Sequence, residues 1–229
     1  MSYRAGVLVF PGSNCDRDLA VALKRAGADV TMIWHKETTL PAGLDLVGIP
    51  GGFSFGDYLR CGAIAANSPI MRAVADFAHG GGHVMGICNG FQVLVETGLL
   101  PGALMRNANL RFICRTETLV VSTEASPFTR AYTKGQEIRV PIAHHDGNYV
   151  ATDEILRQLS AEDRIAFRYT STPNGAMDDI AGILSANRRV LGLMPHPERA
   201  VDEQHGGVDG KGVFASLAEA LGTSLLQEA

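Results

Sequence analysis

The sequence predicts an α/β fold with a mostly parallel sheet and a small antiparallel extension in its C-terminal half. Two short apolar runs, at 5–10 and 44–49, are typical of strands that are buried on both faces. A helical pattern separates the first run from a second strand at 28–34, and this strand–helix–strand spacing indicates parallel pairing. Beyond Pro101 the chain becomes rich in β-forming residues, which indicates the extension. We expect one domain over residues 1–229.

In the N-terminal half, turn residues separate the predicted elements. A helix is expected at about 16–26, with Asp16 or Asn14 as its candidate cap. A helical segment at 60–79 contains Pro69, which kinks or divides it. Three consecutive glycines then lead into a further strand at 83–87.

The C-terminal half is predicted to hold five strands and two helices. We expect the strands at 110–121, 137–143, 164–169, 180–184 and 189–194, and the helices at about 153–160 and 212–221. The last two strands flank residues 185–188, which suit a hairpin loop.

The composition is that of an ordinary globular chain. A net charge of −4 offers no general attraction to nucleic acid or to an anionic membrane. The N-terminal apolar run is too short for a signal peptide, and no segment is long enough to span a bilayer. The four cysteines are far apart and include no Cys-x-x-Cys pair, so neither a zinc ribbon nor a disulfide scaffold is indicated. We expect a cytoplasmic protein without a bound metal.

The most informative stretch runs from Gly86 to Gln92. Cys88 lies between Gly86 and Gly90, and small residues at these positions allow a sharp strand-to-helix turn. We call this turn, from Gly86 to Gly90, the elbow. A helix that begins just after Cys88 would place the sulfur at the positive end of the helix dipole, which favours the nucleophilic thiolate. The alternative is a buried structural cysteine, the usual fate of a free cysteine.

A second stretch supplies a base for such a nucleophile. His196 precedes a proline, which favours an extended backbone, and residues two apart in an extended segment point to the same side. Glu198 can therefore hold one nitrogen of His196 and leave the other for a nucleophile, as in the general triad arrangement. The alternative is a surface turn punctuated by Pro195 and Pro197.

Two adjacent glycines, Gly51 and Gly52, follow the strand at 44–49. At the carboxyl end of a strand they can turn backbone N–H groups into a ligand crevice, although an ordinary tight turn is the alternative.

Other polar clusters carry weaker signals. The run His144-His145-Asp146 has no second ligand cluster with metal spacing, so a loop or strand-end role is favoured. Four arginines form either a basic face for a partner or an anionic ligand, or separate solvated groups: Arg60, Arg106, Arg111 and Arg115. The remaining cysteines lack the elbow context and are interpreted as packing residues: Cys15, Cys61 and Cys114.

With these residues in view, the sequence resembles the triad-type (class I) glutamine amidotransferases, and among them the glutaminase subunits of phosphoribosylformylglycinamidine synthase. The resemblance covers nearly the whole chain, and the motifs that carry it lie at 10–16, 50–60, 88–92, 173–175 and 194–199. The elbow and the His-Pro-Glu end are shared across the class, whereas the first two motifs are specific to this subunit. One departure is His144-His145-Asp146-Gly147, where the family usually has His-Gly-Glu-Gly.

The resemblance implies a doubly wound, flavodoxin-like sheet with helices on both faces. It also implies that Cys88 attacks the glutamine side-chain amide, that His196 moves the proton and that Glu198 orients His196. The N–H of Asn89, with that of Gly52 or Phe53, would hold the oxyanion. Gln92 matches a position that helps to hold glutamine.

The implied partners are a separate synthetase subunit, which would bind ATP and Mg²⁺, and a small accessory subunit. The complex would convert formylglycinamide ribonucleotide to its amidine with the released ammonia. The chain itself is expected to need no cofactor. The alternative function is a stand-alone cysteine hydrolase that cleaves γ-glutamyl or peptide substrates on the same elbow.

Overall fold

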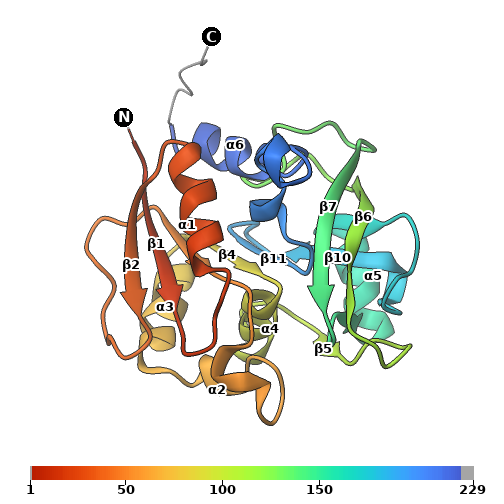
Figure 1. Ribbon diagram of the computed structural model, residues 1–229, viewed down its shortest axis with the longest axis horizontal. Coiled ribbons are helices and arrows are strands. Elements are labelled where there is room, and N and C mark those ends of the chain that lie inside the picture. The colour runs from red at the N-terminus through yellow and green to blue at the C-terminus, as the bar shows by residue number, and fades with distance from the viewer. Residues whose placement is uncertain (1, 223–229) are drawn as a thin grey trace.

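The computed structural model describes residues 2–222, and its centre is one nine-stranded mixed sheet (Figure 1). Across the sheet the strands follow the order β2 (Asp29–Trp34), β1 (Arg4–Val9), β3 (Leu46–Ile49), β4 (His83–Ile87), β11 (Val190–Leu193), β10 (Ile180–Leu184), β9 (Ile165–Tyr169), β6 (Ile113–Val121) and β7 (Glu137–His144).

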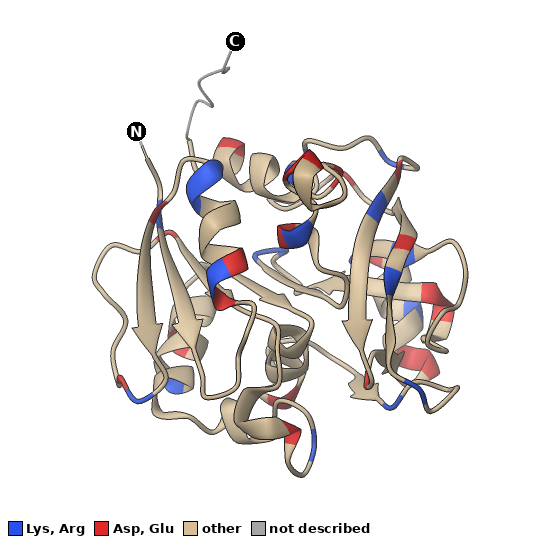
Figure 2. Ribbon diagram, viewed as in Figure 1, with Lys and Arg blue, Asp and Glu red and all other residues tan. Residues whose placement is uncertain are grey.

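The first five of these strands are parallel, which confirms the predicted fold class. All four residues of β3 and of β11 are buried, as expected for strands covered on both faces. Charged residues lie along the outer elements, whereas β4 and β11 in the middle of the sheet carry none (Figure 2). The central strands therefore form an apolar core that ends in the loops described below.

The other four strands continue the same sheet with antiparallel pairing. The predicted hairpin around 185–188 is present, with Leu184 opposite Leu191. A separate two-stranded sheet pairs β5 (Ala103–Met105) with β8 (Asn148–Val150), two short strands that the sequence analysis did not predict.

Helices cover both faces of the parallel half: α1 and α6 lie in front of the sheet in Figure 1, and α3 lies behind it. The helical segment at 60–79 is divided at Pro69, as predicted, because proline is tolerated in the first turn of a helix. The helices are α1 (Asp16–Arg25), α2 (Ala63–Ala66), α3 (Pro69–His79), α4 (Asn89–Glu96), α5 (Asp153–Ala161) and α6 (Lys211–Ala220). Short 3₁₀ turns are η1 (Ser54–Asp57), η2 (Met177–Asp179), η3 (Pro197–Arg199) and η4 (Glu203–His205). Within residues 2–222, every helix is too short or too polar to span a lipid bilayer.

The topology brings four loops to one edge of the sheet. Strands β1, β3, β4 and β11 are mutually parallel neighbours, so the segments that follow them lie at the same edge. In open α/β sheets this carboxyl edge is where ligands bind.

Candidate active site

Cys88 lies at a sharp turn between β4 and α4. Its φ of 51° and ψ of −107° place a non-glycine residue in a rarely populated region, which costs on the order of 1–3 kcal/mol. The two flanking glycines explain how the turn fits, because a Cβ at Gly86 would press on the Gly90 backbone and one at Gly90 would overlap the Ile49 carbonyl. The predicted strand–turn–helix elbow is therefore present.

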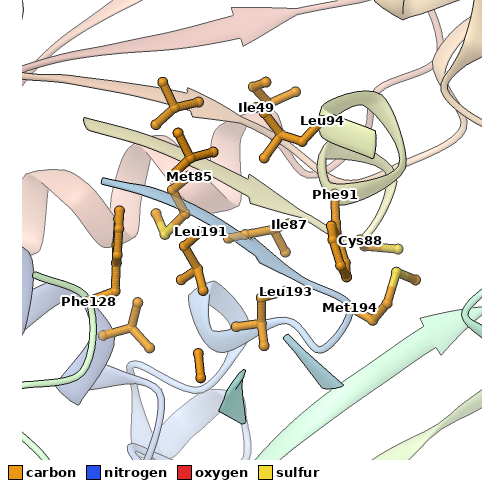
Figure 3. Close-up of a cluster of buried hydrophobic side chains, with 14 of the residues drawn as sticks. Ile49, Met85, Ile87, Cys88, Phe91, Leu94, Phe128, Leu191, Leu193 and Met194 are labelled. Carbon is orange, nitrogen blue, oxygen red and sulfur yellow. The ribbon is translucent and has the colours of Figure 1, made fainter. Parts of the chain in front are cut away.

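The elbow is anchored in the core. The Cys88 N–H donates to the Leu193 carbonyl at 2.7 Å, which ties the turn to the end of β11. Figure 3 shows Cys88 at the edge of the apolar cluster, with Phe91 and Met194 beside it. Its Sγ lies 3.8 Å from the Ala143 carbonyl oxygen. The strained turn is therefore held by packing on one side and by backbone hydrogen bonds on the other.

His196 and Glu198 form a buried pair at the end of β11. Nδ1 of His196 lies 2.6 Å from Oε1 of Glu198, and the two residues are 1% and 4% exposed. The expected extended segment is absent, because the residues from Pro197 to Arg199 form the 3₁₀ turn η3. The 3₁₀ turn brings the His196 and Glu198 side chains together instead. The predicted pairing is therefore present, but with a different backbone conformation.

The free edge of the His196 ring faces the elbow across a glycine. A Cβ at Gly51 would come within 2.8 Å of His196 Cε1 and 3.3 Å of Cys88 Cβ, so only glycine leaves room for these side chains to meet. Burial lowers the pKa of His196, but the Glu198 carboxylate and the Cys88 sulfur outweigh it and hold that pKa well above its usual value. A sulfur, an imidazole and a carboxylate are thus close together.

The loop after β3 supplies backbone N–H groups beside the elbow. The Phe53 N–H donates to the Gly12 carbonyl at 3.0 Å, so it is occupied in this conformation. The N–H groups of Gly52 and Asn89 make no hydrogen bond to any described residue. Gly52 has a φ of 129°, and a Cβ there would meet the Asn14 backbone at 2.6 Å. Of the two predicted partners for Asn89, the geometry therefore favours Gly52.

The side chains of Asn89 and Gln92 hold this region together. Asn89 accepts from the Ser54 N–H at 3.3 Å and donates to Asp57 Oδ1 at 3.2 Å, which fastens the loop to the elbow helix. Gln92 accepts from Asn89 at 2.9 Å and donates to the Asp146 carbonyl at 2.7 Å. Both ends of the Gln92 amide are therefore engaged within the protein, and its contact with glutamine stays a prediction.

The 144–147 segment, whose role the sequence left open, is a support for the site. His144 is buried, and Asn174 donates to its Nε2 at 3.2 Å and to the Gly147 carbonyl at 2.8 Å. A Cβ at Gly147 would overlap the His144 ring, so this glycine is required. The carbonyl of Asp146, which lies between these two residues in the sequence, is the acceptor for Gln92 described above.

The charge of the four arginines is mostly balanced by nearby carboxylates. Three of them pair with separate carboxylates, namely Arg60 with Glu96, Arg106 with Asp146 and Arg115 with Glu117.

Cys15 belongs to the site, which the sequence analysis did not predict. The sequence interpretation made it a packing residue, but its sulfur accepts from Arg199 Nη2 at 3.1 Å, and Arg199 is held in turn by Asp18 at 3.0 Å. Cys15, His196 and Glu198 place potential metal-ligand atoms within 4.8 Å of one another. The available signal was the motif at 10–16, which resembled the family but carried no chemical pattern of its own.

A small cavity opens beside His196. It has a volume of about 150 Å³, and Cys15, Phe53, Phe112 and Ala143 contribute to its lining. This is below the roughly 300 Å³ of drug-sized sites, and suits a ligand of amino-acid size. Three larger surface hollows lie away from Cys88 and His196.

A cysteine on a strained strand–helix elbow, with a paired histidine and carboxylate beside it, defines the class of α/β enzymes with a nucleophilic cysteine. Comparisons with known proteins narrow this class. A family model described as a CobB/CobQ-like glutamine amidotransferase domain matches residues 2–210.

Close relatives are subunits of one synthase. The PurQ subunit of phosphoribosylformylglycinamidine synthase from Jannaschia sp. is 70% identical, over 95% of this chain and 98% of its own length. That of Roseobacter denitrificans is 69% identical with the same coverage. A chain in the PurLQS structure from Thermotoga maritima matches with a TM-score of 0.89 and 46% identity, over 96% of this chain and all of that one.

The chain therefore belongs to the glutamine amidotransferase family, within the PurQ subunits of phosphoribosylformylglycinamidine synthase. The resemblance found in the sequence is confirmed. The alternative of a stand-alone hydrolase is not favoured, because relatives that match nearly end to end are synthase subunits.

Proposed function

We propose that this chain hydrolyses glutamine at Cys88 and passes the ammonia to a separate synthetase subunit. The observation that carries the proposal is that Cys88, His196 and Glu198 lie close together at the carboxyl edge of the sheet. The synthetase would use ATP and Mg²⁺ to convert formylglycinamide ribonucleotide to its amidine. Four free cysteines, none paired, agree with a reducing cytoplasm as the setting.

In the proposed first step, the Cys88 sulfur attacks the amide carbon of glutamine after its proton has passed to His196. The carbonyl oxygen becomes an oxyanion, and the free N–H groups of Gly52 and Asn89 are the donors proposed to stabilise it. Glu198 stabilises the imidazolium and fixes its orientation. The high pKa of His196 supports its role as the proton acceptor.

In the second step, His196 returns the proton to the nitrogen, the C–N bond breaks and ammonia leaves. A γ-glutamyl thioester then remains on Cys88. His196 takes a proton from a water molecule, which attacks the thioester and releases glutamate and the free thiol.

We propose that the synthetase covers the mouth of this cavity, because ammonia released into water is protonated and lost as a nucleophile. Phe53 and Phe112 line the cavity, and the two segments that carry them, 53–59 and 110–112, hold further exposed apolar side chains of the kind found at interfaces: Tyr58, Leu59 and Leu110. The Phe53 and Phe112 rings, which join the two segments, lie 6.4 Å apart, centre to centre. The Thermotoga maritima relative belongs to a PurLQS structure, which supports a synthetase partner and a small accessory subunit.

The docking surface can be tested with Leu59→Asp, at a side chain that is 91% exposed. We expect the variant to fold but no longer to co-purify with the synthetase. Val21→Asp, at an exposed position on α1, is the matched control and should co-purify normally. Equal co-purification of both variants would contradict this placement of the partner.

The chemical step can be tested with Cys88→Ala in the reconstituted complex. Glutamine-dependent synthesis should be lost, whereas synthesis supplied with ammonium should remain, since the synthetase is untouched. Cys61→Ala, at a cysteine outside the lining of the cavity, is the control. Undiminished use of glutamine by the Cys88 variant would refute the proposed mechanism.

A further inference from the structure

The proposed hydrolysis leaves one buried nucleophilic group unused. Cys15 is 2% exposed and lies just before α1, across Gly51 from the elbow. A Cβ at Gly51 would come within 3.4 Å of its sulfur and 2.8 Å of His196 Cε1, so both side chains share the space that this glycine leaves open. None of the steps described above requires this thiol.

The atoms around Cys15 are those that a soft divalent cation prefers. A thiol, an imidazole and a carboxylate come within 4.8 Å of one another, and all three residues are buried. Ligand atoms around tetrahedral zinc lie about 3.5 Å apart, so the ion would take the place of the proton between His196 Nδ1 and Glu198 Oε1, which are now 2.6 Å apart, as these side chains separate. Three protein ligands with an open fourth position are common around Zn²⁺.

A second observation points to a ligand at this place. Glu198 Oε2 is fully shielded, yet it has no hydrogen-bond partner among the described residues. Buried polar atoms are nearly always satisfied, so this orphan oxygen indicates a place that another group completes. Glutamine would occupy the His196 side during turnover, but the outer oxygen of Glu198 faces no group in the proposed reaction.

The cavity beside His196 offers a path for an ion. It is lined by both Cys15 and His196, and the exposed Cys114 also contributes to its lining. Arg199 acts in two directions here. Its guanidinium disfavours a second cation nearby, whereas its N–H donates to the Cys15 sulfur and so fixes the position of that ligand atom.

We propose that Cys15, His196 and Glu198 form an inhibitory site for a soft divalent cation of the Zn²⁺ type. Binding releases the thiol proton and forms a sulfur–metal bond, and the proton between His196 Nδ1 and Glu198 moves to Nε2 of the same ring. The ion then holds the imidazole and the carboxylate, so His196 no longer accepts the proton of Cys88. The inhibition rests on the function proposed above, whereas binding of the ion does not depend on it.

Binding is tested directly by titrating the metal-free full-length chain with Zn²⁺ against a chromophoric chelator. Cys15→Ala should weaken binding by more than about 100-fold, which exceeds the usual effect of losing an outer-shell partner. Cys88→Ala and Cys114→Ala should still bind the ion, because neither is in the proposed set. Circular dichroism confirms that each variant is folded, and Cys15→Ser, with a poorer zinc ligand, replaces the alanine variant if that one does not fold.

Cobalt provides an independent readout. Co²⁺ bound to a thiolate gives a sulfur-to-metal absorption band, which should appear with the wild-type chain and with Cys88→Ala but not with Cys15→Ala. Zinc should also inhibit glutaminase turnover, and a chelator should restore it. Binding that survives Cys15→Ala, or that disappears in Cys88→Ala, would overturn the proposal. If the metal-free wild-type chain, with its synthetase, showed no glutaminase activity, the proposed function would be contradicted, whereas the result on metal binding would still hold.

Discussion

Gly90, in the first turn of α4, lies directly against the carbonyl oxygen of Ile49 at the end of β3. This approach lets the helix begin immediately after Cys88 and brings the elbow beside the loop that carries Gly52.

Gly90→Ala should therefore disturb both the fold and the elbow. Its Cβ would overlap a backbone oxygen that cannot rotate away, and overpacking of this kind costs about 1–3 kcal/mol. Thermal unfolding should show a lower midpoint than that of the wild type. Gly80→Ala, at the end of α3 with a φ of −70° and its nearest contact at 3.3 Å, should have a much smaller effect. Equal midpoints for the two variants would argue against the packing described for the elbow.

Glu198→Gln should slow turnover while leaving the fold intact. The amide is close in shape to the carboxylate, but it can donate to Nδ1 of His196 and favour the wrong tautomer. We expect kcat to fall by about 10²–10⁴ with a smaller change in KM. The control is Glu203→Gln, in the exposed turn η4. A kcat near that of the wild type would mean that Glu198 does not orient His196.

Gly52→Ala should remove an oxyanion donor. The new Cβ would come within 2.6 Å of the Asn14 backbone, and the alanine would have to adopt a φ of 129°, so the loop should shift. Loss of one such donor typically reduces the rate by about 10²–10³. Gly206→Ala is the matched control, because Gly206 also has a positive φ, of 100°, but has open space where the Cβ would lie. It measures the effect of backbone strain without loss of an oxyanion donor. If both variants hydrolysed glutamine equally well, Gly52 would have no such role.

His144 should make the protein less stable in mild acid. Burial lowers the pKa of His144 to about 4, and the charge of His196 adds to the effect, whereas the unfolded side chain titrates near 6.5. Between these values the unfolded chain binds more protons, so the free energy of unfolding falls as the pH falls. The full loss is on the order of 3 kcal/mol.

Urea unfolding at several pH values between 7 and 4, which bracket the two pKa values, would measure this slope. His144→Gln should flatten it, because the side chain keeps an acceptor for Asn174 but no longer titrates. The exposed His79→Gln should leave it unchanged. A wild-type slope that persists in His144→Gln would assign the acid sensitivity to another group.

Local patterns made much of this molecule predictable. The buried runs of β1 and β3 and the division at Pro69 follow from short segments whose apolar and turn residues are sufficient evidence. The pairing of His196 with Glu198 was predictable for the same reason, since two residues of separation leave few arrangements. The backbone of that pair was predicted wrongly, because a proline on each side also suits a 3₁₀ turn.

Long-range packing decided the features that were not predicted. The position of Cys15 beside His196 depends on the loop after β1 meeting the loop after β3, which no local pattern specifies. The occupied N–H of Phe53 has the same origin, because its acceptor is the carbonyl of Gly12. The three-residue strands β5 and β8 pair with each other across about 45 residues of sequence, and Tyr149 of β8 packs against Phe91 of α4, so local patterns do not reveal them.

The central claim is that Cys88 is the nucleophile toward glutamine, and covalent trapping tests it most directly. The chain is incubated with an electrophilic glutamine analogue, with and without excess glutamine, and the adduct is located by mass spectrometry of peptides. We predict one adduct, on Cys88, that excess glutamine prevents and that His196→Ala slows. An adduct on Cys15, Cys61 or Cys114 with Cys88 unmodified, or no adduct on an active enzyme, would contradict the account.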